Sequence, residues 1–252
     1  MAICAMMCGF DTWSEITLFA QEREPWFRRW LSLPGGIPSH DTFNRIFATL
    51  PPASLKSIFQ AWIGDIMGDD KLVGQLAVDG KALRATAKGR GANAVHMVNV
   101  WSTEQGMCVG QQKVADKSNE ITAIPELLQL LELKGCFVSI DAMGTQVKIA
   151  DTILKKSGDY LLAVKDNQPS LNTEVKEQFQ AYWDKNETDV SGPGFTEQFD
   201  SEHGRKEHRR CWVLVVDESM PVCQQWKAKT IIAVQAERVE NGKGYDFVRF
   251  YI

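Results

Sequence analysis

The chain has 252 residues and a formal net charge of −4 at pH 7, with 44% hydrophobic and 24% charged residues. Such a length and composition are typical of a globular protein of one or two domains. The acidic balance argues against a surface that coats nucleic acid as a whole, although it leaves room for a local basic groove. No stretch reaches the roughly 18 apolar residues of a membrane span, and the six dispersed cysteines favour a cytoplasmic protein with reduced thiols.

Residues 1–70 predict a small all-helical domain. The apolar N-terminus lacks the basic region of a signal peptide, so we expect a core helix there. Ser39 is a suitable N-cap for a helix with apolar residues at helical spacing, and a second such series follows Pro51-Pro52. Helical hairpins of this kind occur in DNA-reading helix-turn-helix units and in ordinary structural domains, and both interpretations stay open.

After Gly68-Asp69-Asp70 the pattern changes, and residues 71–252 predict an α/β domain. Three consecutive strands favour an antiparallel meander, and the alternation that follows favours crossovers onto the same sheet. We expect a loop over 184–200. The predicted strands cover 75–79, 95–101, 107–114, 136–140, 160–164, 209–216, 230–237 and 245–252, and the predicted helices cover 121–131, 147–154 and 171–182.

Two aspartates, Asp79 and Asp141, each follow an apolar strand directly. Ligands of open α/β sheets gather outside the carboxyl ends of strands, so the two carboxylates converge if their strands are neighbours. Carboxylates and water are the ligands that Mg²⁺ prefers, and two such ions can clamp the oxygens of a phosphodiester. Strand-end acids are also common turn residues, and a site for small phosphate esters is a further alternative.

Two short stretches, residues 79–90 and residues 202–210, carry local positive charge that suits a polyanion such as DNA. Solvated turns are the alternative, and for the loop after the strand at 160–164 the alternative is capping of that loop. The residues predicted to contact DNA are Lys81, Arg84, Lys88, Arg90, Lys165, Asn167, Gln168, His203, Arg205, Arg209 and Arg210.

Several long motifs occur in one order along nearly the whole chain: GIPSHDTFNRIF (36–47), VDGKALR (78–84), VADKSNEITAIPELL (114–128), IDAMGTQ (140–146), YLLAVKDNQP (160–169) and HGRKEHRRCWV (203–213). With these motifs the chain resembles the bacterial H-repeat-associated proteins, the insertion-sequence transposases linked to RHS elements. The resemblance implies a DDE-type transposase with an RNase H-like mixed sheet and flanking helices, preceded by a small helical domain.

In such enzymes three acids bind two Mg²⁺ (or Mn²⁺) ions, and Asp79 and Asp141 match the first two. The sequence departs from the family pattern at the third acid, because no segment resembles the H-W-x-I-E-N context of the last glutamate. We therefore expect a C-terminally truncated copy, in which Glu207 is the remaining candidate for the third catalytic and metal-binding acid. The alternative for Glu207 is a polar partner on a basic strand that faces DNA.

The resemblance implies a DNA transposase that cleaves and joins DNA by phosphoryl transfer. The alternative is an inactive truncated remnant that at most binds DNA. The implied partner is double-stranded DNA, both insertion-sequence ends and target, with a homodimer on paired ends, no membrane and no small-molecule cofactor. The expected location is the bacterial cytoplasm, in association with the nucleoid when DNA is bound.

Overall fold

The computed structural model describes residues 1–252 except 68–71, 84–94, 115–119, 186–193, 203–204 and 241–242. The chain divides into two compact units, Met1–Gly68 and Asp69–Ile252. Each unit has its own set of elements and its own core, so each is described separately.

The first unit is all helical. A capping box between Thr12 and Glu15 starts its second helix. The Ser39 side chain caps the fourth helix, which confirms the predicted N-cap. Its small core contains Ala2, Ala5, Ile16 and Phe43. The helices are α1 (Ala2–Met7), α2 (Trp13–Glu22), α3 (Glu24–Phe27), α4 (His40–Thr49) and α5 (Pro52–Met67).

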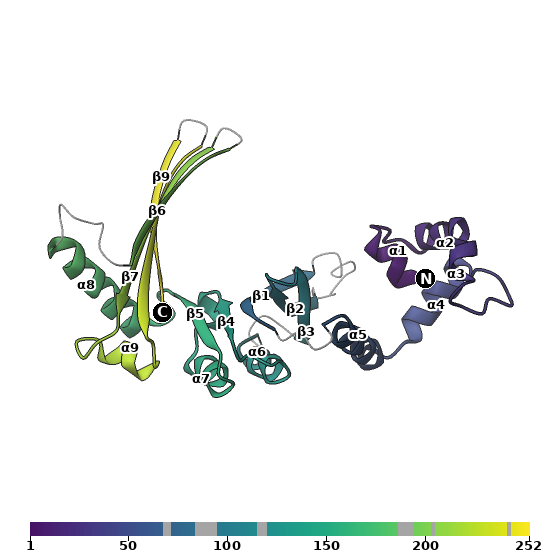
Figure 1. Ribbon diagram of the computed structural model, residues 1–252, viewed down its shortest axis with the longest axis horizontal. Coiled ribbons are helices and arrows are strands. Elements are labelled where there is room, and N and C mark those ends of the chain that lie inside the picture. The colour runs from purple at the N-terminus through teal and green to yellow at the C-terminus, as the bar shows by residue number, and fades with distance from the viewer. Residues whose placement is uncertain (68–71, 84–94, 115–119, 186–193, 203–204, 241–242) are drawn as a thin grey trace, which may run out of the picture. The chain divides into compact units, whose positions relative to one another are not determined.

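The second unit is a mixed α/β structure (Figure 1). Its strands are β1 (Gly74–Leu83), β2 (Val95–Ser102), β3 (Met107–Val114), β4 (Cys136–Ile140), β5 (Asp159–Val164), β6 (Phe195–Glu202), β7 (Arg205–Val215), β8 (Thr230–Glu240) and β9 (Lys243–Tyr251). Its helices are α6 (Glu120–Gln129), the 3₁₀ helix η3 (Ala142–Gly144), α7 (Val147–Lys155), α8 (Pro169–Lys185) and α9 (Pro221–Gln225).

The strands form one sheet in the order β3-β2-β1-β4-β5-β9-β8-β7-β6. β1, β2 and β3 are an antiparallel meander, whereas β4 pairs parallel to β1 and β5 pairs parallel to β4. The meander and the later crossovers onto the same sheet are therefore confirmed. This mixed sheet with flanking helices confirms the predicted fold class, an RNase H-like α/β fold preceded by a helical domain.

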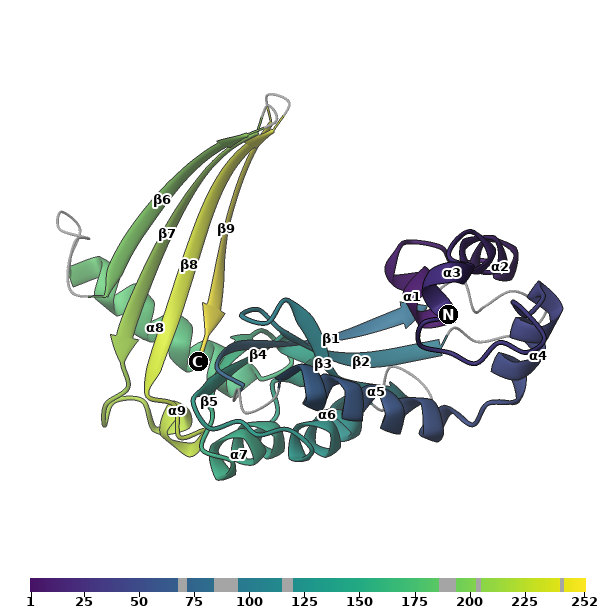
Figure 2. The same ribbon diagram turned by 45° about the vertical axis from the view of Figure 1, so that its right-hand side comes forward.

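The last four strands extend into a long curved sheet, here called the arm (β6–β9), whose outer part projects beyond α8 and α9 (Figure 2). β9 runs antiparallel to β5 and pairs with it at Ala163–Tyr251 and Val164–Phe250. Val164 is the carboxyl end of β5, so the rest of β9 and the outer arm lie beyond that end.

Two details of the sheet differ from the sequence prediction. Asp79 lies inside β1 and not just after it, because β1 continues to Leu83 in a ladder with β2. The predicted loop over 184–200 is wrong at its end, because Phe195–Glu202 is strand β6. Most of β6 is exposed, so its sequence lacks the apolar alternation of a half-buried strand, and pairing with β7 holds it in place.

Helices α6 and α7 pack against the first half of the sheet. Their apolar residues share a core with Val78 of β1, Val138 of β4 and Leu162 of β5. At the base of the arm, the ring of Phe179 in α8 lies 5.8 Å from that of Phe250 in β9. No helix among the described residues is long and apolar enough to cross a membrane.

The buried thiols give a simple check of this core. Burial raises the pKa of Cys136, and burial with a hydrogen bond to Glu174 raises the pKa of Cys223 to about 12. Because the thiolate is the reactive form, both residues are expected to resist a disulfide reagent at about pH 8 while exposed Cys8 reacts. Counting the reactive thiols in native buffer and again in urea tests this, and rapid native reaction of Cys136 or Cys223 would contradict the packing.

Candidate active site

The two predicted aspartates lie on neighbouring parallel strands. Val78 of β1 is in register with Ile140 of β4, and the next residue on each strand is Asp79 and Asp141. Val78 and Ile140 point into the core, and both aspartates are exposed. The structure therefore brings Asp79 and Asp141 to the same level of the sheet, on adjacent strands.

Backbone amides fix the position of the Asp141 carboxylate. Its Oδ1 atom accepts hydrogen bonds from the amide of Met143 at 3.1 Å and from that of Gly144 at 3.4 Å, which caps η3. Gly144 must lack a side chain, because a Cβ there would collide with Cγ2 of Ile140. This tight turn holds the carboxylate at the end of β4.

The loop after β5 braces the same turn. The Asn167 amide donates to the carbonyl of Ala142 at 2.6 Å, and the Gln168 amide donates to the carbonyl of Thr145 at 2.9 Å. The Thr145 hydroxyl, fully buried, donates to the carbonyl of Ala163 at 2.6 Å. The geometry of Asn167 and Gln168 thus matches the loop-capping alternative.

Replacing Asn167 with alanine is expected to loosen the Asp141 turn. The loss of one hydrogen bond to a partly buried carbonyl should lower the free energy of unfolding by about 1 kcal/mol. The measurement is urea unfolding of the variant, read beside its DNA-cleavage rate. Alanine at exposed Lys165 in the same loop is the matched control for stability, and equal losses of unfolding free energy in the two variants would contradict the bracing role.

A polar row extends from Asp79 across the meander. Asp79 is paired with Asn99 of β2, and Asn99 is paired with Gln111 of β3, whose amide donates to the Asn99 side chain at 2.8 Å. Lys81 is exposed and lies on the Asp79 face, two residues along β1. Sequence reasoning missed Asn99 and Gln111, since only the strand register places them beside Asp79. The predicted contacts Arg84, Lys88 and Arg90 lie outside the described residues.

The structure does not bring Glu207 to the aspartate pair. Glu207 lies in β7, and β5, β9 and β8 separate β7 from β4. At about 4.8 Å per strand, this is a separation of roughly 19 Å across the sheet. Glu207 is buried, with 5% exposure, and its carboxylate lies 2.8 Å from Nε of Arg209 and 3.5 Å from Nε of Arg238. Its surroundings match the polar-partner alternative.

Glu207 belongs to one face of the arm, opposite the face on which α8 packs. The strand register puts Glu207, Arg209, Arg238 and Arg249 on this face, here called the arginine face, together with Asp200. The guanidinium of Arg249 lies 4.8 Å from the ring centroid of Phe247, which shares that face. Among the described side chains on this face, three cations and two carboxylates give a net positive charge.

The remaining basic candidates differ in their surroundings. Arg210 points to the other face of the arm and forms an ion pair with Glu237. His203 and the side chain of Arg205 lie outside what the structure describes. Among the predicted DNA contacts in the arm whose side chains the structure describes, Arg209 therefore lies on the arginine face and Arg210 does not.

The donor chemistry of the aspartate pair suits a hard divalent cation, because both groups are exposed carboxylates on adjacent strands. Over the residues whose placement is described, no three His, Cys, Asp or Glu side chains are grouped closely enough to hold a metal ion. The described site therefore offers two acidic ligands.

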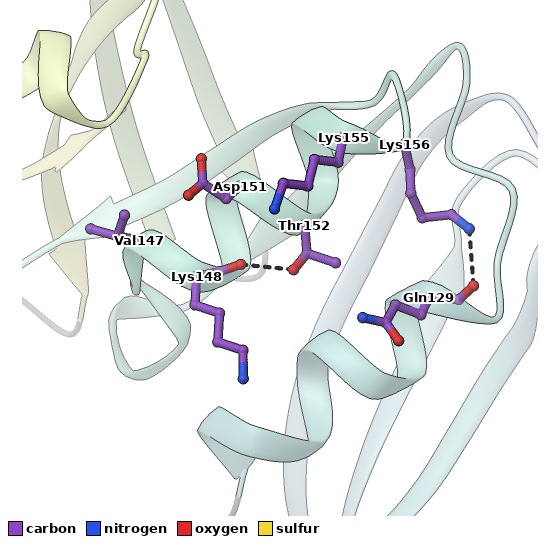
Figure 3. A pocket seen from close by; sticks show the side chains of 7 residues that line it. All are labelled: Gln129, Val147, Lys148, Asp151, Thr152, Lys155 and Lys156. Atoms are coloured by element: carbon purple, nitrogen blue, oxygen red, sulfur yellow. Dashed lines mark hydrogen bonds between the residues drawn. The ribbon is translucent and has the colours of Figure 1, made fainter.

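A separate hollow of about 560 Å³ lies on the outer side of α6 and α7. Figure 3 shows Lys148, Lys155 and Lys156 around it, with Lys156 donating to the carbonyl of Gln129 at 2.9 Å. Neither Asp79 nor Asp141 lines this hollow. It is a basic surface on the helices and no part of the aspartate pair.

Comparison with known proteins places the chain in a family. Residues 74–220 match the family described as Transposase DDE domain, and residues 1–63 match the family described as DDE_Tnp_1-associated. Among solved structures, a piggyBac transposase in a synaptic complex with hairpin DNA aligns with 94% of this chain and 50% of that chain. The two chains share 10% sequence identity, with a TM-score of 0.40.

Relatives match most of the chain. An "Uncharacterized protein in dhlA 3'region" of Xanthobacter autotrophicus is 37% identical over 96% of this chain and 81% of its own length. The "Putative transposase YncI" of Escherichia coli O157:H7 is 38% identical over 100% of this chain and 65% of its own length. The "H repeat-associated putative transposase YhhI" of Escherichia coli K12 is 37% identical over 100% of this chain, which spans 67% of that relative. The chain belongs to the DDE transposase domain family.

Proposed function

We propose that this chain is a DNA transposase that cleaves and joins DNA by phosphoryl transfer, with Asp79 and Asp141 as its metal-binding acids. The register of β1 and β4 carries the proposal, because it sets the two carboxylates side by side at one level of the sheet. Family membership supports a dependence on divalent metal. Asp79 and Asp141 are thus the two acids that the register supports for this role, and the third acid stays a prediction.

In this proposal the two aspartates bind metal, and neighbouring backbone groups hold the Asp141 carboxylate in position. Asp79 and Asp141 would hold Mg²⁺ or Mn²⁺, which when bound activates a water or hydroxyl nucleophile and stabilises charge on the phosphate. The amides of Met143 and Gly144 keep the Asp141 carboxylate oriented. Small displacements of such a group cost large factors in rate, which gives the rigid turn a function.

Double-stranded DNA is the proposed substrate, with the arm as part of its binding surface. The arginine face carries Arg209, Arg238 and Arg249, and β9 extends beyond the carboxyl end of β5, the end at which Asp141 follows the neighbouring strand β4. Arginines bind the phosphate backbone and position a duplex without reading its sequence. A homodimer on paired DNA ends stays a prediction.

A second candidate is a DNA-binding protein without cleavage activity. The separation of Glu207 from the aspartate pair favours it, because the described residues then supply two acids in place of three. Under this candidate the arm still binds DNA, and the aspartates are dispensable for that binding.

A nicking assay on supercoiled plasmid with Mg²⁺, Mn²⁺ or chelator tests the proposal, beside DNA binding measured over a range of salt. Metal-dependent nicking supports the transposase. Salt-sensitive binding without nicking supports the second candidate, since phosphate contacts weaken as salt rises. Absence of both activities would contradict both candidates.

A further inference from the structure

The buried carboxylate of Glu120 has no part in the function described so far. Glu120 is the first residue of α6, and its side chain is 11% exposed. Burying a carboxylate costs free energy unless the charge is paired or hydrogen-bonded. A group kept in such a position close to a candidate metal site calls for a specific explanation.

The Glu120 carboxylate occupies the space next to Gly80. A Cβ at position 80 would lie 2.7 Å from Oε1 of Glu120 and closer still to Oε2 and Cδ. Real Cβ atoms do not approach other atoms so closely, so any side chain at position 80 would displace the carboxylate. Gly80 directly follows Asp79, and consecutive Cα atoms are about 3.8 Å apart.

Two groups near Glu120 can interact with a carboxylate. His96 of β2, the cross-strand partner of Ala82, has Nδ1 at 3.9 Å from Oε1, which makes an ion pair when the imidazole is protonated. The amino terminus of a helix also favours a negative charge. Glu120 thus links α6 to β1 and β2 on the core face, while Asp79 lies on the opposite face of β1.

Resting on the proposed function, we infer that Glu120 is a positioning residue for Asp79. Its carboxylate fills the side-chain space that Gly80 leaves open, and so it fixes β1 at the residue beside Asp79. In this arrangement Gly80 and Glu120 belong together, because a side chain at position 80 would push the carboxylate out of this space. Loss of either partner should therefore disturb the same position.

The test uses the full chain with three variants, Glu120→Ala, Gly80→Ala and the double variant. Each single substitution should weaken Mn²⁺ binding, measured by electron paramagnetic resonance, by about tenfold or more, as is usual when support of a metal ligand is lost. Hydrogen exchange of the β1 peptide around Asp79 should also become faster. The double variant should regain stability relative to Gly80→Ala, because the methyl group enters the vacated space, but it should not regain Mn²⁺ affinity.

Exposed Glu126 on the same helix is the matched control, and Glu126→Ala should change neither measurement. If Glu120→Ala does not fold, Glu120→Asp shortens the side chain and should shift both measurements in the same direction, whereas Glu120→Gln keeps the volume and should leave both near the parent values. Unchanged exchange at β1 in folded Glu120→Ala or Glu120→Asp overturns the inference. A parent chain that takes up no Mn²⁺ refutes the metal role in the proposed function, and the exchange data still decide whether Glu120 positions β1.

Discussion

Replacing Asp141 with asparagine is expected to abolish metal-dependent DNA nicking while leaving the fold intact. The substitution keeps the size of the side chain and an oxygen that accepts from the amides of Met143 and Gly144. It removes the charge that would hold a divalent cation opposite Asp79. A loss of about 3 kcal/mol of transition-state stabilisation corresponds to a rate reduction of more than a hundredfold.

The measurement is the initial rate of plasmid nicking in Mg²⁺ and in Mn²⁺, with circular dichroism to confirm the fold. Asp159→Asn is the matched control, because Asp159 lies at the amino end of the adjacent strand β5, whereas Asp141 follows the carboxyl end of β4. It forms an exposed ion pair with Lys229, whose loss costs little. Equal nicking by the parent and Asp141→Asn would remove this aspartate from the mechanism.

The first half of the sheet could be predicted because its strands are half buried. Apolar runs ending at Asp79 and Asp141, with amphipathic helices between later strands, indicate both the meander and the crossovers. The adjacency of the two aspartates required the strand order, which the sequence supports only through the family resemblance. The register of Val78 with Ile140 then shows that the two aspartates lie at the same level of the sheet.

The arm was harder to predict because much of it is exposed on both faces. β6 lacks apolar alternation, so Phe195–Glu202 gives no strand pattern by itself. The sequence also does not predict that Glu207 is buried. Its ion-pair partner Arg238 lies in β8, far from Glu207 along the chain. A glutamate between basic residues indicates neither a metal ligand nor an ion-pair partner until the strand order is known.

The contact between Gly80 and Glu120 could not be predicted from the sequence either. A glycine after a strand-borne aspartate is typical of a turn, and the sequence gives no sign that Glu120 fills its side-chain space. The contact joins residues far apart in the chain and depends on how α6 packs over β1. Periodicity predicts that helix and that strand, but not which polar atom lies between them.

Replacing Glu207 with alanine is expected to destabilise the arm and to weaken DNA binding without any direct effect on the metal site. The carboxylate neutralises and orients Arg209 and Arg238, and its loss leaves two guanidinium groups side by side. Because both arginines are partly exposed, the cost should be about 2 kcal/mol of unfolding free energy. Urea unfolding measures it, and fluorescence anisotropy with a labelled duplex measures the binding.

Two controls separate this role from metal ligation. Glu197→Ala removes an exposed carboxylate, paired with His208, from the other face of the arm, and it should affect stability much less. Mn²⁺ binding by Glu207→Ala should equal that of the parent, because β7 is separated from β4 by three strands. If Glu207→Ala keeps parental stability but loses Mn²⁺ binding and nicking together, Glu207 acts as the third acid and must approach Asp79 and Asp141 through a rearrangement of the arm.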